Sequence, residues 1–152
     1  LEGLAGVEAS QNLTKENFKV LENLIEEMDA CSAESDYDRF GNLNRRFHKL
    51  IYNASKMELL IKLLDRFWDN GNRYATFFQY LPEIVKRSIK NHREIVQALR
   101  AREESFIRLT LEKDSIGFGR ALADYLGKNG DIVRKDVGRK EVIDKDERGL
   151  SK

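Results

Sequence analysis

Apolar residues recur every three or four positions along most of this chain, and only one proline, Pro82, interrupts the pattern. This period is that of an α-helix with one buried face. A β-sandwich would instead show alternating residues and frequent Pro or Gly turns. The sequence therefore predicts an all-α fold, an antiparallel bundle of six or seven helices.

The segments with this apolar period predict helices at residues 1–10, 14–31, 34–54, 57–80, 82–99 and 103–126. Thr14 is a suitable N-cap for the second helix, and Pro82 suits the first turn of the fifth. Gly71 is expected to bend the fourth. The sixth is expected to bury four apolar side chains: Phe106, Leu109, Ile116 and Leu122.

A chain of 152 residues has the length of one domain, here predicted to cover residues 1–126. Residues 127–152 carry mixed charge, four glycines and few large apolar side chains, so we expect a charged, mobile C-terminal tail. The chain begins with Leu1 rather than Met. We therefore expect a fragment of a longer protein.

The charges almost cancel, with 27 Lys and Arg residues against 26 Asp and Glu residues. This balance gives the chain no overall reason to bind nucleic acid or an anionic membrane. Cys31 is the single cysteine, which fits a reducing cytoplasm. No apolar run is long enough to cross a bilayer.

Both histidines, His48 and His92, fall on the apolar faces of their predicted helices. Asn44 lies four positions before His48 and shares its face, and Asp114 lies on an apolar stretch of the sixth helix. A buried imidazole needs a hydrogen-bond partner or a metal ion. Two interpretations stay open. The histidines are either core residues that form hydrogen bonds within the protein, or ligands of Zn²⁺, Ni²⁺, Mn²⁺ or Fe²⁺.

Three segments make the chain resemble a known family: Leu1 to Ala5, Leu43-Asn44 followed by Phe47-His48, and Asn91 to Leu99. They are similar to the FCD domain, the C-terminal effector-binding and oligomerisation domain of the FadR subfamily of bacterial GntR transcription factors. The resemblance covers about residues 1–126. It implies an all-helical bundle whose centre holds a divalent metal.

The resemblance also implies a set of metal ligands: Asn44, His48, His92 and Asp114. Family members carry an Asp and a His four apart, a later His, and a third His 22 positions after that one. Here Asn44 stands where the family has Asp, and Asp114 stands where it has the third His. The total ligand charge is unchanged, and the exchange favours oxygen-preferring ions such as Mn²⁺ or Fe²⁺.

The function implied is regulatory. A small carboxylate effector would bind the metal, assisted by Arg73 and Tyr74, and a homodimer would contact DNA only through a winged helix-turn-helix upstream of Leu1. A metal-dependent enzyme on the same bundle is an alternative, but no spare histidine remains to act as a base, so no catalytic residue is predicted. A metal-free helical interaction domain is the other alternative.

Overall fold

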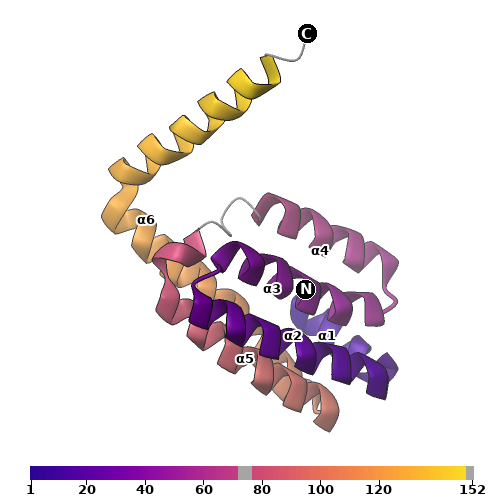
Figure 1. The fold of residues 1–152 in the computed structure, drawn as a ribbon. Coiled ribbons are helices and arrows are strands. Elements are labelled where there is room, and N and C mark those ends of the chain that lie inside the picture. The colour runs from indigo at the N-terminus through magenta and orange to yellow at the C-terminus, as the bar shows by residue number, and fades with distance from the viewer. Residues whose placement is uncertain (72–76, 150–152) are drawn as a thin grey trace. The chain divides into compact units, whose positions relative to one another are not determined.

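The protein is all-α, as predicted, in a computed structural model that describes residues 1–71 and 77–149, with side chains over 1–69 and 77–129. No strand occurs in these ranges. Figure 1 shows the helices, which are α1 (Glu2–Asn12), α2 (Lys15–Glu34), α3 (Tyr37–Ala54), α4 (Glu58–Gly71), α5 (Pro82–Ala101) and α6 (Glu104–Gly149). A short 3₁₀ turn covers residues 77–80.

Local sequence explains where several helices begin. The Thr14 hydroxyl accepts a hydrogen bond from the Asn17 backbone N–H, and the Thr14 N–H donates to Asn17 Oδ1, so α2 begins with a complete capping box. Asp36 caps α3 from one side only, because its Oδ1 accepts a hydrogen bond from the Arg39 N–H. Pro82 occupies the first turn of α5, where its missing N–H leaves no hydrogen bond unmade.

Most of the core lies among α1, α2, α3 and α5, and α4 and α6 each add buried apolar residues to it. Helix α2 packs against both α3 and α5, and the three run alongside one another (Figure 1). Helix α1 contacts α3 and α5, while α4 lies against α3. The largest fully buried apolar side chains are Leu21, Met28, Phe40, Phe47, Ile51, Ile89, Ile95, Leu99, Ile107 and Leu111.

Helix α6 faces the core with a different side from the one predicted. Ile107 and Leu111 are buried, whereas Leu109 and Ile116 are 61% and 40% exposed. The buried side also carries Thr110 and Asp114, whose polar atoms find hydrogen-bond partners there. The prediction was wrong for Leu109 and Ile116, because polar groups that hydrogen bonds satisfy can occupy a buried helix face in place of apolar ones. Phe106, also predicted, is partly buried and packs against the core.

A glycine allows α1 to lie close to α6. A Cβ added at Gly6 would come within 2.3 Å of a Leu111 methyl group and 2.9 Å of Ile107. Gly3, one turn earlier, lies against Arg108. These small residues therefore bring the first turn of α1, and with it Glu2, close to α6.

The chain forms two compact units, Leu1–Phe118 and Gly119–Lys152. In the second unit α6 continues beyond the predicted end at Leu126 as far as Gly149, with non-helical backbone angles at Asn129. Many Lys, Arg and Glu residues and no proline favour helix here. The predicted mobility of residues 127–152 stays a prediction. None of the described helices has the length and apolar character that crossing a membrane requires.

Candidate metal centre

Three helices bring the two histidines and one aspartate to a single point. His48 comes from α3, His92 from α5 and Asp114 from α6. The two Nε2 atoms lie 3.3 Å apart, and Asp114 Oδ2 lies 3.3 Å from His48 Nε2 and 3.5 Å from His92 Nε2. All three side chains are buried. They form a triangle of potential ligand atoms, called the ligand triangle below.

The ligand triangle has the size that a small divalent ion requires. Around a tetrahedral ion, ligand atoms at about 2.0–2.1 Å lie about 3.3–3.4 Å from one another. Two imidazole nitrogens and a carboxylate oxygen are also a common ligand set for first-row metals. The residues therefore fit a metal ion both in spacing and in donor chemistry.

The two oxygens of Asp114 have different partners. Oδ1 accepts hydrogen bonds from Ser88 Oγ and Asn91 Nδ2, at 3.2 and 3.1 Å, while Oδ2 faces the histidines. Burial by itself raises the pKa of Asp114, but hydrogen bonds and charge interactions with His48 and His92 outweigh it. Its pKa consequently lies well below the usual value, and the carboxylate is ionised.

His92 is the most enclosed member of the ligand triangle. Its side chain is fully buried, and burial lowers its pKa even though the hydrogen bond to Asp114 acts in the opposite direction. A lower pKa keeps the imidazole neutral near pH 7, which is the form that binds a metal.

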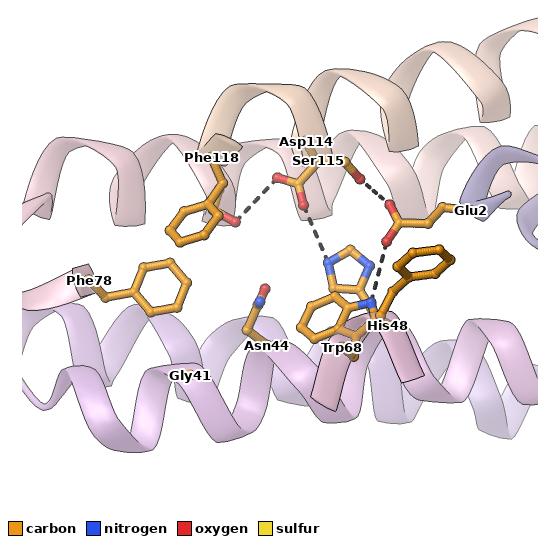
Figure 2. Close-up of a pocket in the computed structure, with 11 residues that line it drawn as sticks. Glu2, Gly41, Asn44, His48, Trp68, Phe78, Asp114, Ser115 and Phe118 are labelled. Atoms are coloured by element: carbon orange, nitrogen blue, oxygen red, sulfur yellow. Dashed lines mark hydrogen bonds and ion pairs between the residues drawn. The ribbon is translucent and has the colours of Figure 1, made fainter. Parts of the chain in front are cut away.

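Asn44 occupies the same region from one turn earlier on α3. It is buried, and its Oδ1 atom has no hydrogen-bond partner among the described residues. Figure 2 shows its amide directed into the space between α3 and α6. A buried carbonyl oxygen without a hydrogen-bond partner lowers the stability of the fold. A metal ion or a bound ligand would supply that partner.

A second group of polar side chains lies behind His48. The Tyr52 hydroxyl lies 3.3 Å from His48 Nδ1 and donates to Glu2 Oε1 at 2.7 Å. The Glu2 carboxylate also accepts from Trp68 Nε1 at 3.3 Å and from Ser115 Oγ. Burial, with a further contribution from Glu2, raises the pKa of Tyr52 well above its ordinary value, so the phenol keeps its proton.

A cavity of about 250 Å³ adjoins the ligand triangle. In Figure 2, Phe78 and Phe118 lie at one end, and Trp68 and Glu2 lie at the other. Its lining combines aromatic rings with a few polar groups, which is typical of small-molecule sites. The lining residues are Glu2, Gly41, Asn44, His48, Phe67, Trp68, Phe78, Ser88, Asp114, Ser115 and Phe118.

The charge of this cavity comes from two carboxylates, Glu2 and Asp114. No lysine or arginine occurs among the lining residues that the structure describes. Arg73 and Tyr74, the predicted effector-binding residues, fall at positions 72–76 and lie outside the described residues. Their role stays a prediction.

Sequence reasoning missed several polar residues around this centre. Three of them carried a usable signal: Ser88 lies one turn before His92, Asn91 lies directly before it, and Tyr52 lies one turn after His48. Residues three or four positions from a helical ligand share its face. Glu2 carried no such signal, because it lies in a separate helix.

A curated relative and a solved structure illustrate what this chain is similar to. The HTH-type transcriptional regulator McbR of Escherichia coli (strain K12) is 27% identical over 144 residues, which cover 91% of this chain and 59% of the relative. The solved structure described as E. coli McbR/YncC has a TM-score of 0.75 at 23% identity, covering 82% of this chain and 63% of that one. The chain thus spans about three-fifths of the length of each.

The family comparison covers most of the first compact unit. The FCD domain matches residues 1–113, a range that holds Asn44, His48 and His92 and ends directly before Asp114. The similar solved structure supports the same helical fold. The chain therefore belongs to the FCD domain family.

Proposed function

We propose that this chain is the effector-binding and oligomerisation domain of a GntR-type transcriptional regulator of the FadR subfamily. It senses a small organic acid through a divalent metal at the ligand triangle. The FCD match and the regulator McbR indicate a transcriptional regulator and not an enzyme. Since such a regulator acts on chromosomal DNA, the proposed location is the bacterial cytoplasm.

The observation that carries this proposal is the convergence of His48, His92 and Asp114 from three helices. Metal ligands must be deprotonated to bind, and the pKa values of His92 and Asp114 are both shifted in the direction that keeps them so. The ion supplies a positive charge to which an effector carboxylate can bind.

The ligand triangle leaves room for an effector. Three protein ligands leave at least one coordination position open, as in metal sites that exchange ligands. Asn44 Oδ1 is a neutral candidate for a fourth ligand, and the aromatic end of the cavity can accept an apolar portion of the effector. Arg73 stays a candidate partner for a carboxylate.

DNA binding is proposed to belong to a winged helix-turn-helix outside this chain, in a homodimer. An effector regulates such a protein only if it binds one arrangement of the helices more tightly than another, because ligands shift populations by their difference in affinity. This chain alone should therefore show no tight, sequence-specific DNA binding at moderate salt. A specific mobility shift would contradict that assignment.

Elemental analysis tests the metal centre directly. Protein purified without added metal should contain about one divalent ion per chain, drawn from Zn²⁺, Ni²⁺, Mn²⁺ or Fe²⁺. Chelation should remove it and lower the thermal midpoint. Absence of metal, together with no midpoint shift on adding each of the four ions, would instead favour the metal-free interaction domain.

Trp68 provides a test of effector binding. It is the only tryptophan in the chain and it lines the cavity. Small carboxylic acids added to the metal-loaded protein should change its fluorescence, and the change should disappear after chelation. An equal response with and without metal would show that the acid binds independently of the ion.

A further inference from the structure

We propose that the cavity beside the ligand triangle selects an ω-amino acid, a small carboxylic acid with an ammonium group at the other end of a short carbon chain. The carboxylate of this ligand binds the metal ion, and its ammonium group binds Glu2. The inference deepens the proposed function and rests on it for the role of the metal. Its structural basis is the charge of the cavity and the position of Glu2 in it.

The charged groups of the cavity suit a ligand with a positive end. Glu2 and Asp114 are the two carboxylates of its lining, and no lysine or arginine occurs among the lining residues that the structure describes. Asp114 belongs to the ligand triangle, where a metal ion balances its charge. Glu2 does not, and its hydrogen-bond partners in the described part of the chain are the uncharged Tyr52, Trp68 and Ser115. The charge of Glu2 is therefore left for a ligand to balance.

Glu2 can accept a further hydrogen bond. A carboxylate offers about four lone-pair sites. Oε1 accepts from Tyr52 and Trp68, at 2.7 and 3.3 Å. Oε2 lies next to Ser115 Oγ, but that hydroxyl has a single proton and a second acceptor in reach, the Leu111 carbonyl at 3.1 Å. An ammonium group, which has three N–H donors, can therefore bind at Oε2 without displacing Tyr52 or Trp68.

A buried amide identifies the cavity as a binding site independently of its charge. Asn44 is 8% exposed and lines the cavity, and its Oδ1 has no hydrogen-bond partner within the described residues. Figure 2 shows the Asn44 amide directed into the space that Glu2 and Trp68 close at one end. The open positions at Asn44 and Glu2 both accept hydrogen bonds, so the missing groups are cations or donors. Aromatic rings also attract ammonium groups, and Trp68 supplies one beside Glu2.

The position of Glu2 sets the length of the ligand. His48 Nε2 faces Asp114, whereas Nδ1, on the other side of the ring, lies 3.3 Å from the Tyr52 hydroxyl that donates to Glu2. An imidazole ring and a phenol oxygen thus separate the two binding points. The charged groups of an α-amino acid share one carbon, so that molecule is too short to contact both. The cavity of about 250 Å³ exceeds the roughly 150 Å³ that holds a benzene molecule, so a chain of a few carbons fits.

Matched pairs of probes separate the effect of the ammonium group from that of the carboxylate. Calorimetry at pH 7 on the Zn²⁺-loaded 152-residue chain compares β-alanine, γ-aminobutyrate and δ-aminovalerate with propionate, butyrate and valerate. At least one amino acid should bind about 10-fold to 100-fold more tightly than its matched acid, because it gains a hydrogen bond between two charged groups.

Glu2→Gln is the decisive variant, because it removes the charge and keeps the shape. The preference for the amino acid should disappear, while the matched acid should bind as it does to the wild type, which also shows that the variant is folded. Ser115→Ala keeps the carboxylate and should retain the preference. Glu8→Gln, an exposed change on the same helix, is the matched control and should retain it as well.

An amine without a carboxylate tests Glu2 separately from the metal. The indole N–H of Trp68, the only tryptophan in the chain, donates to Glu2, so its ¹H–¹⁵N NMR signal reports on that carboxylate. n-Butylammonium should shift this signal in the metal-free wild type and leave it unchanged in Glu2→Gln.

The two sets of measurements distinguish the inference from the proposed function. If none of the acids binds but n-butylammonium shifts the Trp68 signal, metal-dependent sensing fails while the ammonium site at Glu2 stands. Equal affinities within each matched pair in the wild type would overturn the inference, and so would a preference that Glu2→Gln retains. If neither the acids nor n-butylammonium bind, both proposals fail.

Discussion

The Nε2 atoms of His48 and His92 lie 3.3 Å apart in the core, although 44 positions separate the two residues in the chain. Two imidazole nitrogens at this distance require a shared proton or a cation between them, because two lone pairs repel. Asp114 Oδ2 faces both nitrogens and adds negative charge. Either a shared proton or a bound cation satisfies this arrangement, and Asp114 would balance the positive charge in both cases.

Removal of either histidine should abolish metal binding. We expect His92→Gln and His48→Gln to reduce the metal content from about one ion per chain to near zero, with an affinity loss above the roughly 10-fold to 100-fold that indirect partners of a metal contribute. Plasma mass spectrometry of the purified protein measures the content. Gln97→Ala, an exposed change on α5, should bind normally. Full metal content in both histidine variants would exclude this centre.

Asn44→Asp restores the carboxylate that the family resemblance implies at this position. In the presence of a chelator, the free energy of unfolding of the variant should be lower by about 1–3 kcal/mol. The reason is that a third carboxylate is then buried in the cavity beside Glu2 and Asp114. With Mn²⁺ the variant should instead be more stable than the wild type, because the ion gains a charged oxygen ligand. Thermal midpoints with Mn²⁺ and with EDTA measure both effects.

Asn42→Asp is the control for this experiment, because Asn42 lies exposed on the same helix. It should change the midpoint little and by the same amount in both conditions. An Asn44→Asp protein that behaves like Asn42→Asp would show that residue 44 does not approach the ion.

Gly6→Ala should separate α1 from α6. The new methyl group would overlap Leu111 and Ile107, both buried, so the free energy of unfolding should fall by about 1–3 kcal/mol. Gly119→Ala meets nothing within 4 Å and should instead be neutral or favourable by up to about 1 kcal/mol through helix propensity. Urea unfolding followed by circular dichroism measures both. Equal stabilities would contradict the close approach of α1.

The stability of the metal-free protein should depend on pH through His92. Because burial lowers the pKa of His92 in the folded state, the unfolded chain binds a proton first as the pH falls below about 6.5. The free energy of unfolding should then decrease toward acid pH, by at most about 1.4 kcal/mol per pH unit from this group. The lowered pKa of Asp114 acts with the same sign below about pH 4.

Urea unfolding in EDTA at pH 7.5 and pH 5.5 measures this dependence. The decrease between the two should be smaller in His92→Gln, which has no imidazole to protonate. An identical decrease in the variant would assign the effect to other groups.

Much of the fold could be predicted from local sequence. Thr14 and Pro82 mark helix starts through interactions within one turn, and the apolar period placed both histidines on the faces that are buried. The family resemblance, and not the helical period, predicted that His48, His92 and Asp114 lie together. The period alone could not distinguish ordinary core histidines from metal ligands.

The parts that could not be predicted depend on contacts between distant residues. The inward face of α6 is decided by Asn91 and Ser88 of α5, which satisfy Asp114, and not by the apolar content of α6 alone. Glu2 reaches Tyr52 across 50 positions of sequence, a contact that no local period encodes.

The separate partners of the two Asp114 oxygens have a consequence for denticity. With Oδ1 committed to Ser88 and Asn91, the carboxylate can offer a metal one oxygen only. The protein would then offer a metal four ligand atoms: one carboxylate oxygen, two imidazole nitrogens and one amide oxygen. An ion that prefers six ligands would keep exchangeable positions. Ion and effector would then be linked thermodynamically, each raising the affinity of the domain for the other by the same factor.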